Sequence, residues 1–245
     1  DGWFDLFVTN FSGESTTLYK NEKNGFFTDV TFASGLGQPS LDLLSWGTKF
    51  IDLDLDGDLD IFTVNGHINE NVKYFSSNYF YKQPKQIFIN QGGGKYVDNS
   101  KNYGPAIEKK EVSRGAAFAD IDNDGDSDII ISNNNSFATL IINENKNKNN
   151  WIGLILEGIS INKDAIGAKI KVNSETKNQH FFINPGSSYL SSNDKRVQIG
   201  LGLDSKINYI EINWLNNKEP EIFTNFDLNN YYKLTEGGKK EKISY

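Results

Sequence analysis

Two aspartate-rich nonapeptides are the residues of this sequence best suited to bind a metal ion. They read DLDLDGDLD over 52–60 and DIDNDGDSD over 120–128, so each places five aspartates at alternate positions around a glycine. Carboxylates this close together repel one another by about 1 kcal/mol or more per pair, even in water. A divalent cation would relieve that repulsion. An all-oxygen ligand set with a glycine for the tight turn favours Ca²⁺ over Mg²⁺, which requires stricter octahedral geometry.

The two loops begin like an EF-hand loop but end differently. An EF-hand requires glutamate at the twelfth position, whereas Thr63 and Ile131 occupy that position here, inside strand-like runs. We therefore expect the ninth residue, Asp60 or Asp128, to close each site. The alternative is an acidic surface turn without a metal. Two complete copies at the same repeat position argue against that alternative, and their recurrence favours a structural over a catalytic role.

The loops belong to a repeat that occurs three times. Residues 1–5 match the second half of a loop, and in every copy an apolar run ends on an asparagine five residues after the last aspartate, at Asn10, Asn65 and Asn133. Short β-branched and aromatic runs separated by Gly, Asn and Asp are typical of consecutive antiparallel strands. The repeat is longer than the roughly 40–50 residues of one propeller blade, and insertions at 66–86 and 101–113 account for the excess.

Composition excludes several other kinds of protein. With no cysteine, the chain has no disulfide, thiolate zinc site, iron–sulfur cluster or cysteine nucleophile. A net charge of −7 argues against nucleic acid as a partner. No apolar run approaches the roughly 18 residues that a membrane-spanning helix needs, so we expect no membrane insertion. The chain contains no methionine and starts within a loop, which indicates a fragment whose export signal cannot be judged.

Both halves of the chain resemble known families. The element GxxFxDxDxDGDxDIxxxN is similar to the FG-GAP/VCBS repeat of integrin-α-like β-propellers. The stretches NKDAIGAKIKV (162–172), RVQIGLG (196–202) and INYIEINW (207–214) resemble the ASPIC/UnbV domain. Together they resemble the family of cartilage acidic protein and its bacterial relatives. The absence of cysteine excludes the EGF-like module of the animal members and favours a bacterial relative.

The resemblance implies a ligand set for calcium. Carboxylates at loop positions 1, 3, 5 and 9 and the carbonyl at position 7 would bind the ion. These groups are Asp52, Asp54, Asp56 and Asp60 with the carbonyl of Asp58 in one loop, and Asp120, Asp122, Asp124 and Asp128 with the carbonyl of Asp126 in the other. Only Asp1, the carbonyl of Trp3, and Asp5 remain of the first copy. We expect two complete Ca²⁺ sites and a third that is truncated.

The predicted fold is all-β in two parts. Residues 1–142 form part of a β-propeller, whose N-terminal blades are expected to be missing because propellers have 4–8 blades. Residues 143–150, NENKNKNN, read as a polar linker. The remaining predictions are a small β-sandwich-like domain over 151–237 and a solvated tail over 238–245.

The first insertion is the best candidate for a ligand surface, because aromatic rings on a loop can stack on sugars or anchor a protein. There are two alternatives. The aromatic residues could pack the insertion against its own blade, and His67 could cap a loop. Lys195 and Arg196 lie in a polar cluster to which the sequence assigns no role. The ligand-surface candidates are His67, Tyr74, Phe75, Tyr79, Phe80 and Tyr81.

These features predict a calcium-stabilised module, extracellular, periplasmic or at the cell surface, for adhesion or recognition of an extracellular protein or glycan. We assign no catalytic residues, since the sequence has no GxSxG, P-loop or dinucleotide motif and no acid/base pair outside the acidic loops. One alternative is a calcium-dependent polysaccharide lyase or hydrolase, or a non-catalytic appendage of one. Another is a structural component of a surface array.

Overall fold

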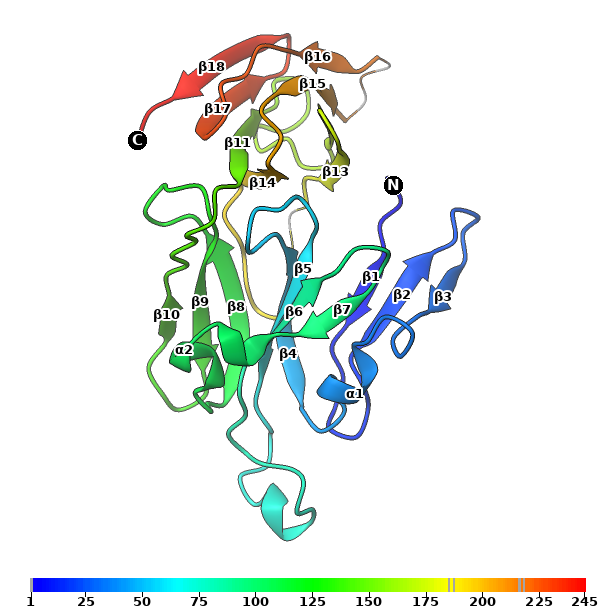
Figure 1. Cartoon of the computed structure of the whole chain (residues 1–245), viewed down its shortest axis with the longest axis vertical. Helices are drawn as coiled ribbons and strands as arrows, with labels where there is room; N and C mark the ends of the chain where they lie inside the picture. Colours follow the sequence, from blue (N-terminus) through cyan, green and yellow to red (C-terminus); the bar gives the residue numbers. More distant parts are fainter. Residues whose placement is uncertain (1, 185, 187, 216, 218) are drawn as a thin grey trace.

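The computed structural model describes residues 2–184, 186, 188–215, 217 and 219–245. Within them the regular secondary structure is almost entirely strands, arranged in five sheets (Figure 1), which confirms the predicted all-β class. Three sheets come from residues before the polar segment at 143–150, and two come from residues that begin at its last position, Asn150. The helices are single turns in connections: α1 (Gly37–Ser40), η1 (Val72–Tyr74), η2 (Ser100–Asn102) and α2 (Pro105–Glu108).

The first three sheets are antiparallel propeller blades. The first pairs its strands in the order β1 (Leu6–Val8), β2 (Thr17–Asn21) and β3 (Phe27–Asp29). The second is complete, with β4 (Ser45–Ile51), β5 (Asp60–Asn65), β6 (Gln86–Asn90) and β7 (Tyr96–Asp98). The third contains β8 (Ser113–Ala119), β9 (Asp128–Asn133) and β10 (Thr139–Ile141). In register with the others, β1 corresponds to β5 and β9, and within the described residues its inner edge is unpaired.

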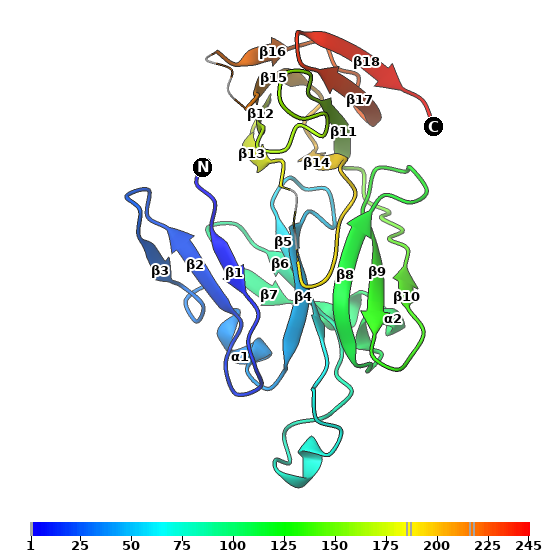
Figure 2. The same ribbon diagram turned by 180° about the vertical axis from the view of Figure 1, so that it is seen from behind.

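The blades are held together by their inner strands. Strands β4 and β8 lie side by side in both views (Figure 2). A Cβ at Gly47 would lie 2.7 Å from the Ala116 nitrogen, so the two backbones approach closely. Phe62 and Phe118 meet edge to face at 5.6 Å within a buried cluster shared by both blades. This arrangement confirms the predicted partial propeller.

The C-terminal domain is a sandwich of two four-stranded sheets. Ile152, Ile170, Ile199 and Ile212 are among the buried residues of the core between them. One sheet has the order β14 (Val197–Gly202), β11 (Asn150–Glu157), β17 (Asn230–Thr235) and β18 (Lys239–Ile243). The other has the order β13 (Asn178–Phe182), β12 (Lys169–Ser174), β15 (Ile207–Asn213) and β16 (Glu221–Phe223).

The end of the chain differs from its predicted role. Residues 238–245 were expected to be a solvated tail, but they include β18, which pairs antiparallel with β17. The strand is lysine-rich and exposed or half-exposed along its whole length, so no apolar alternation marks it. Backbone pairing at a sheet edge is sufficient to order it.

The two ends of the blades have different neighbours. The loops at 52–60 and 120–128 lie at the end that faces the C-terminal domain, and the first insertion projects as an arm from the opposite end (Figure 1). We call residues 66–83 the arm. None of the helices in the described part of the chain is long and apolar enough to span a bilayer.

Candidate metal centres

The two acidic loops have the same backbone conformation. Each joins an inner strand to the next strand of its blade, β4 to β5 and β8 to β9. The fourth and sixth positions have positive φ in both loops: Leu55 (59°) and Gly57 (90°), Asn123 (64°) and Gly125 (101°). A leucine in this region is rare and strained, whereas glycine adopts it freely. The shared conformation shows that the sequence repeat is also a structural repeat.

In the first loop, carboxylate oxygens of Asp52, Asp54 and Asp60 lie within 4.8 Å of one another. The Asp52 carboxylate accepts the backbone N–H groups of Asp56 (3.1 Å) and Gly57 (2.9 Å). These hydrogen bonds orient a buried carboxylate toward the centre of the turn. The arrangement suits an ion that prefers several oxygen ligands.

The second loop gathers Asp120, Asp122 and Asp124, again with carboxylate oxygens within 4.8 Å of one another. The fully buried Asp120 carboxylate accepts the N–H groups of Asp124 (3.2 Å) and Gly125 (2.8 Å). These are the same loop positions that hold Asp52 in the first loop. The two loops therefore present equivalent candidate ligands at their first and third positions.

The last aspartate of each loop ties it to its blade. In each copy, the backbone N–H of an asparagine at or just beyond the end of the second following strand donates to this carboxylate. The pairs are Asn21 with Asp5 (2.7 Å), Asn90 with Asp60 (2.8 Å) and Asn143 with Asp128 (2.9 Å). Among the ninth-position aspartates, only Asp60 belongs to one of the two carboxylate groups described above. Asp1 lies outside the described residues, and Trp3 is exposed.

Burial makes these loops electrostatically unfavourable without a cation. Desolvation raises the pKa of Asp52 to about 8, and the neighbouring carboxylates act in the same direction. Desolvation likewise raises the pKa values of Asp60 and Asp126 to about 7. Near neutral pH these groups therefore resist ionisation. A bound divalent cation would stabilise their charged form.

The seventh positions differ between the loops. The Asp58 carboxylate forms an ion pair with Lys177 of the C-terminal domain, 3.2 Å away. Asp126 is buried, and its Oδ2 accepts the N–H of Asn145 (3.0 Å). Its Oδ1 has no hydrogen-bond partner among the described residues. A buried, unpartnered carboxylate oxygen within the second loop fits a cation site. The carbonyl ligands at both positions remain a prediction.

Residues 143–150, which were expected to form a linker, instead form hydrogen bonds with both loops. Asn143 Nδ2 donates to the Leu53 carbonyl (3.0 Å), and Asn149 Nδ2 donates to the Asp54 carbonyl (2.9 Å). The polar, asparagine-rich composition of this segment, which read as a linker, supplies side-chain amides that bind loop carbonyls. The segment is thus part of the frame around the candidate metal centres.

In the arm, some of the predicted ligand residues pack and others do not. His67 is buried, its Nδ1 accepts the Asn69 N–H (3.0 Å), and burial lowers its pKa. This geometry is that of a loop-capping histidine. Tyr79 stacks on His67 with 6.5 Å between ring centroids, and the Tyr81 hydroxyl accepts a hydrogen bond from Asn134 (3.2 Å). The Phe11 ring, between β1 and β2, meets the His67 ring edge to face at 5.3 Å. His67 and Tyr81 therefore connect the arm to the blades, and Tyr79 packs on His67 within the arm.

The tip of the arm is open to solvent. Tyr74 is 87% exposed and Phe75 79% exposed. Phe80 is partly exposed and lies beneath the ammonium groups of Lys73 (6.0 Å) and Lys110 (5.5 Å). The structure thus separates the aromatic candidates into an anchoring group and an exposed group.

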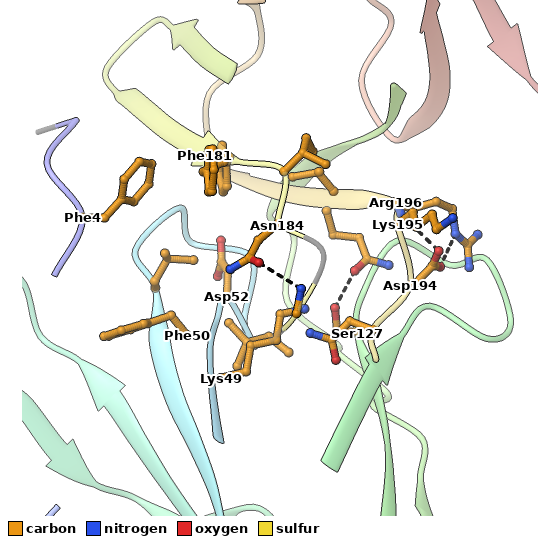
Figure 3. A pocket seen from close by; sticks show the side chains of 18 of the residues that line it. Phe4, Lys49, Phe50, Asp52, Ser127, Phe181, Asn184, Asp194, Lys195 and Arg196 are labelled. Atoms are coloured by element: carbon orange, nitrogen blue, oxygen red, sulfur yellow. Dashed lines mark hydrogen bonds and ion pairs between the residues drawn. The ribbon is translucent and has the colours of Figure 1, made fainter. Parts of the chain in front are cut away.

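A cavity of about 860 Å³ lies between the blades and the C-terminal domain. Figure 3 shows Lys49 and Asn184 directed toward one another within it, with Phe4, Asp52 and Phe181 nearby. Desolvation lowers the pKa of Lys49 to about 8, although Asp194 acts in the opposite direction. One wall comes from β1, whose inner edge is unpaired within the described residues.

Comparison with known proteins supports the two-part organisation. Residues 1–63 match the FG-GAP-like repeat family, and residues 158–241 match the ASPIC and UnbV family. The first match contains the loop at 52–60. The loop at 120–128 lies outside it and is assigned by the internal repeat.

Relatives similar to most of this chain carry the name Cartilage acidic protein 1. The Xenopus tropicalis protein is 25% identical over 268 residues, which cover 90% of this chain and 40% of the frog protein. The Mus musculus protein is 23% identical over 87% of this chain and 40% of its own length. The Homo sapiens protein is 26% identical over 89% and 32%, respectively. The chain thus spans well under half the length of these relatives, and the predicted resemblance is confirmed.

Proposed function

We propose that this pairing of FG-GAP-like repeats with an ASPIC/UnbV domain is a calcium-stabilised recognition module that acts outside the cell or at its surface. Calcium binding is supported by the duplicated acidic loop. In each copy, carboxylate oxygens of three aspartates lie within 4.8 Å of one another. Oxygen-only ligands and loop affinities of about 10⁻⁴–10⁻³ M suit extracellular calcium. The role of the ion is to stabilise the fold, because the loops recur once per blade and connect strands.

Calcium is expected to raise the melting temperature. A ligand at 100 times its Kd stabilises a protein by about 2.7 kcal/mol, which corresponds to roughly 5–10 °C for a chain of this size. The double variant Asp54→Ala/Asp122→Ala removes the third-position carboxylate of both loops and should abolish the shift. Differential scanning calorimetry with Ca²⁺ and with EDTA measures it.

Asp42→Ala is the matched control, because this exposed aspartate lies outside both loops. It should leave the calcium response unchanged. A parent protein whose melting temperature is the same in calcium and in EDTA would disprove the calcium part of the proposal.

The recognition part rests on the tip of the arm. Tyr74 and Phe75 expose large apolar surfaces. Their arm is connected to the blades through His67, which meets the Phe11 ring at 5.3 Å, and through Tyr81, which binds Asn134. Rigidly presented aromatic side chains bind partners with little loss of conformational entropy. We propose that they contact an extracellular protein or glycan.

The double variant Tyr74→Ser/Phe75→Ser is expected to lose at least about 10-fold in affinity, since truncating an aromatic hot-spot residue costs about 2 kcal/mol or more. Binding to panels of purified polysaccharides and matrix proteins, measured by surface plasmon resonance, checks this. Phe26→Ser is the control, because Phe26 is 73% exposed but lies on the turn between β2 and β3. Equal loss in both variants would contradict a specific role for the arm, and cleavage of a polysaccharide would favour the enzymatic alternative.

A further inference from the structure

Strand β14 has two faces with different neighbours. Ile199 and Leu201 are buried in the core of the C-terminal sandwich. Because side chains alternate along a strand, the intervening residues point the other way. Gln198, Gly200 and Gly202 on that face contact the acidic loops.

The start of this face contacts the second loop. Arg196, immediately before β14, donates hydrogen bonds to the Asp120 carbonyl and to Asn123 Oδ1 (2.6 Å). Gln198 Oε1 accepts the Ser127 hydroxyl (2.6 Å). Across the sheet, the Tyr231 hydroxyl donates to Oδ2 of Asp120, one of the three converging carboxylates.

The end of the same face contacts the first loop. The Gly202 N–H donates to the Leu55 carbonyl (2.9 Å). Gly200 lies so close to the loop that a Cβ there would be 2.1 Å from Oδ2 of Asp52. Lys177, on the turn between β12 and β13, donates to the Asp56 carbonyl of the same loop (2.7 Å). One strand therefore contacts both candidate metal centres.

We infer that one face of β14, together with Arg196 and Tyr231, positions the two calcium loops, so that calcium binding and packing of the C-terminal domain on the blades are coupled. Arg196, Gln198 and Tyr231 position the second loop, and Gly200 and Gly202 position the first. The inference rests on the calcium binding proposed above and assigns a role to the RVQIGLG stretch. None of these side chains needs to contact the ion. They hold the loop carbonyls and the Asp120 carboxylate in place.

The coupling is reciprocal. When the C-terminal domain packs better on the calcium-bound form of a loop than on its calcium-free form, this packing raises the calcium affinity of the loop. Calcium then strengthens the packing of the domain by the same factor. Loss of groups that orient metal-binding side chains typically costs about 10- to 100-fold in metal affinity. The buried contacts of Tyr231 with Asp120 and with the Trp151 ring, 5.1 Å away, place it at the centre of this coupling.

The test compares two neighbouring tyrosines in the full chain. Tyr231→Phe removes the hydroxyl that holds Asp120 and should weaken calcium binding at the second loop by about 10-fold or more, as measured by isothermal titration calorimetry. Tyr232→Phe is the matched control. Tyr232 is also buried in β17, but its hydroxyl accepts the N–H of Asp227 (2.9 Å), away from both loops, so its calcium affinity should equal that of the parent.

Hydrogen exchange of the Gly202 amide provides an independent readout, because this amide crosses the interface to Leu55. Calcium should slow exchange of this amide in the parent, and should slow it less in Arg196→Gln. Because Arg196→Gln leaves the sandwich core intact, it keeps the test valid if Tyr231→Phe fails to fold. If the parent does not bind calcium, the proposed function fails and this inference fails with it. If the parent binds calcium but neither variant changes affinity and Gly202 exchange is insensitive to calcium, only the coupling is overturned.

Discussion

Replacing Glu111 with alanine is expected to lower the free energy of unfolding by about 3–5 kcal/mol. Lys85 is fully buried, and its ammonium donates to Glu111 Oε2 and to the Lys109 carbonyl (3.1 Å). Thr139 Oγ1 donates to the same carboxylate (2.9 Å). The variant leaves a buried cation with a single carbonyl partner. The loss is large because the desolvation penalty of Lys85 is then no longer offset.

Chemical denaturation with urea measures the effect, and Lys109→Met is its control. Lys109 also pairs with Glu111 (2.7 Å), but its side chain is 63% exposed, so its removal should cost less than about 1 kcal/mol. The double variant Lys85→Met/Glu111→Leu should recover most of the loss, because it buries no unpaired charge. Similar losses in Glu111→Ala and Lys109→Met would show that the buried pair does not hold this region.

The Lys85–Glu111 pair also makes the free energy of unfolding depend on pH in a predictable direction. Burial acts to raise the pKa of Glu111, but hydrogen bonds from Lys109, Lys85 and Thr139 outweigh it and lower the pKa from 4.5 to about 2. A carboxyl group whose pKa is lower in the folded state stabilises that state fully at pH values above its unfolded-state pKa. This stabilisation disappears as the pH falls through its folded-state pKa. The stability difference between the parent and Glu111→Ala should therefore narrow between about pH 4.5 and 2.

Local patterns made most of the fold predictable. The Asp–Gly register predicted two equivalent turns, because alternating carboxylates and a glycine impose their own backbone geometry, and Gly57 and Gly125 have the expected positive φ. Runs ending on Asn65 and Asn133 are the strands that leave those turns. The strand β18 was missed because both of its faces are solvated, so hydrophobic periodicity carries no signal for it.

The frame around the candidate metal centres was not predictable in the same way. Tyr231 contacts Asp120 across 111 residues of sequence, and Arg196 contacts it across 76. Contacts of such separation leave no local periodicity. In the sequence, Arg196 stands out only as part of a motif. The asparagines at 143–149 resemble a solvated linker in the sequence, because the carbonyl groups that bind their amides lie far away along the chain.

Replacing Gly200 with alanine is expected to push the first acidic loop away from the C-terminal domain, with a loss of about 1–3 kcal/mol in unfolding free energy. A Cβ at this position would lie 2.1 Å from Oδ2 of Asp52 and 2.5 Å from backbone carbon atoms of Leu55. Leu55 already has a positive φ of 59°, so its backbone has little freedom to move aside. The methyl group would therefore displace Asp52, the first-position carboxylate of the proposed calcium site.

This displacement predicts two linked results. Urea unfolding in EDTA should show the loss of stability, and calcium titration should show weakened binding at the first loop. Gly186→Ala is the matched control, because a Cβ there would lie more than 4 Å from every described residue that is not its chain neighbour, and it should change neither quantity. A stable Gly200→Ala protein with unchanged calcium affinity would mean that the loop tolerates movement of Asp52. The close contact between β14 and the loop would then be packing without influence on the metal.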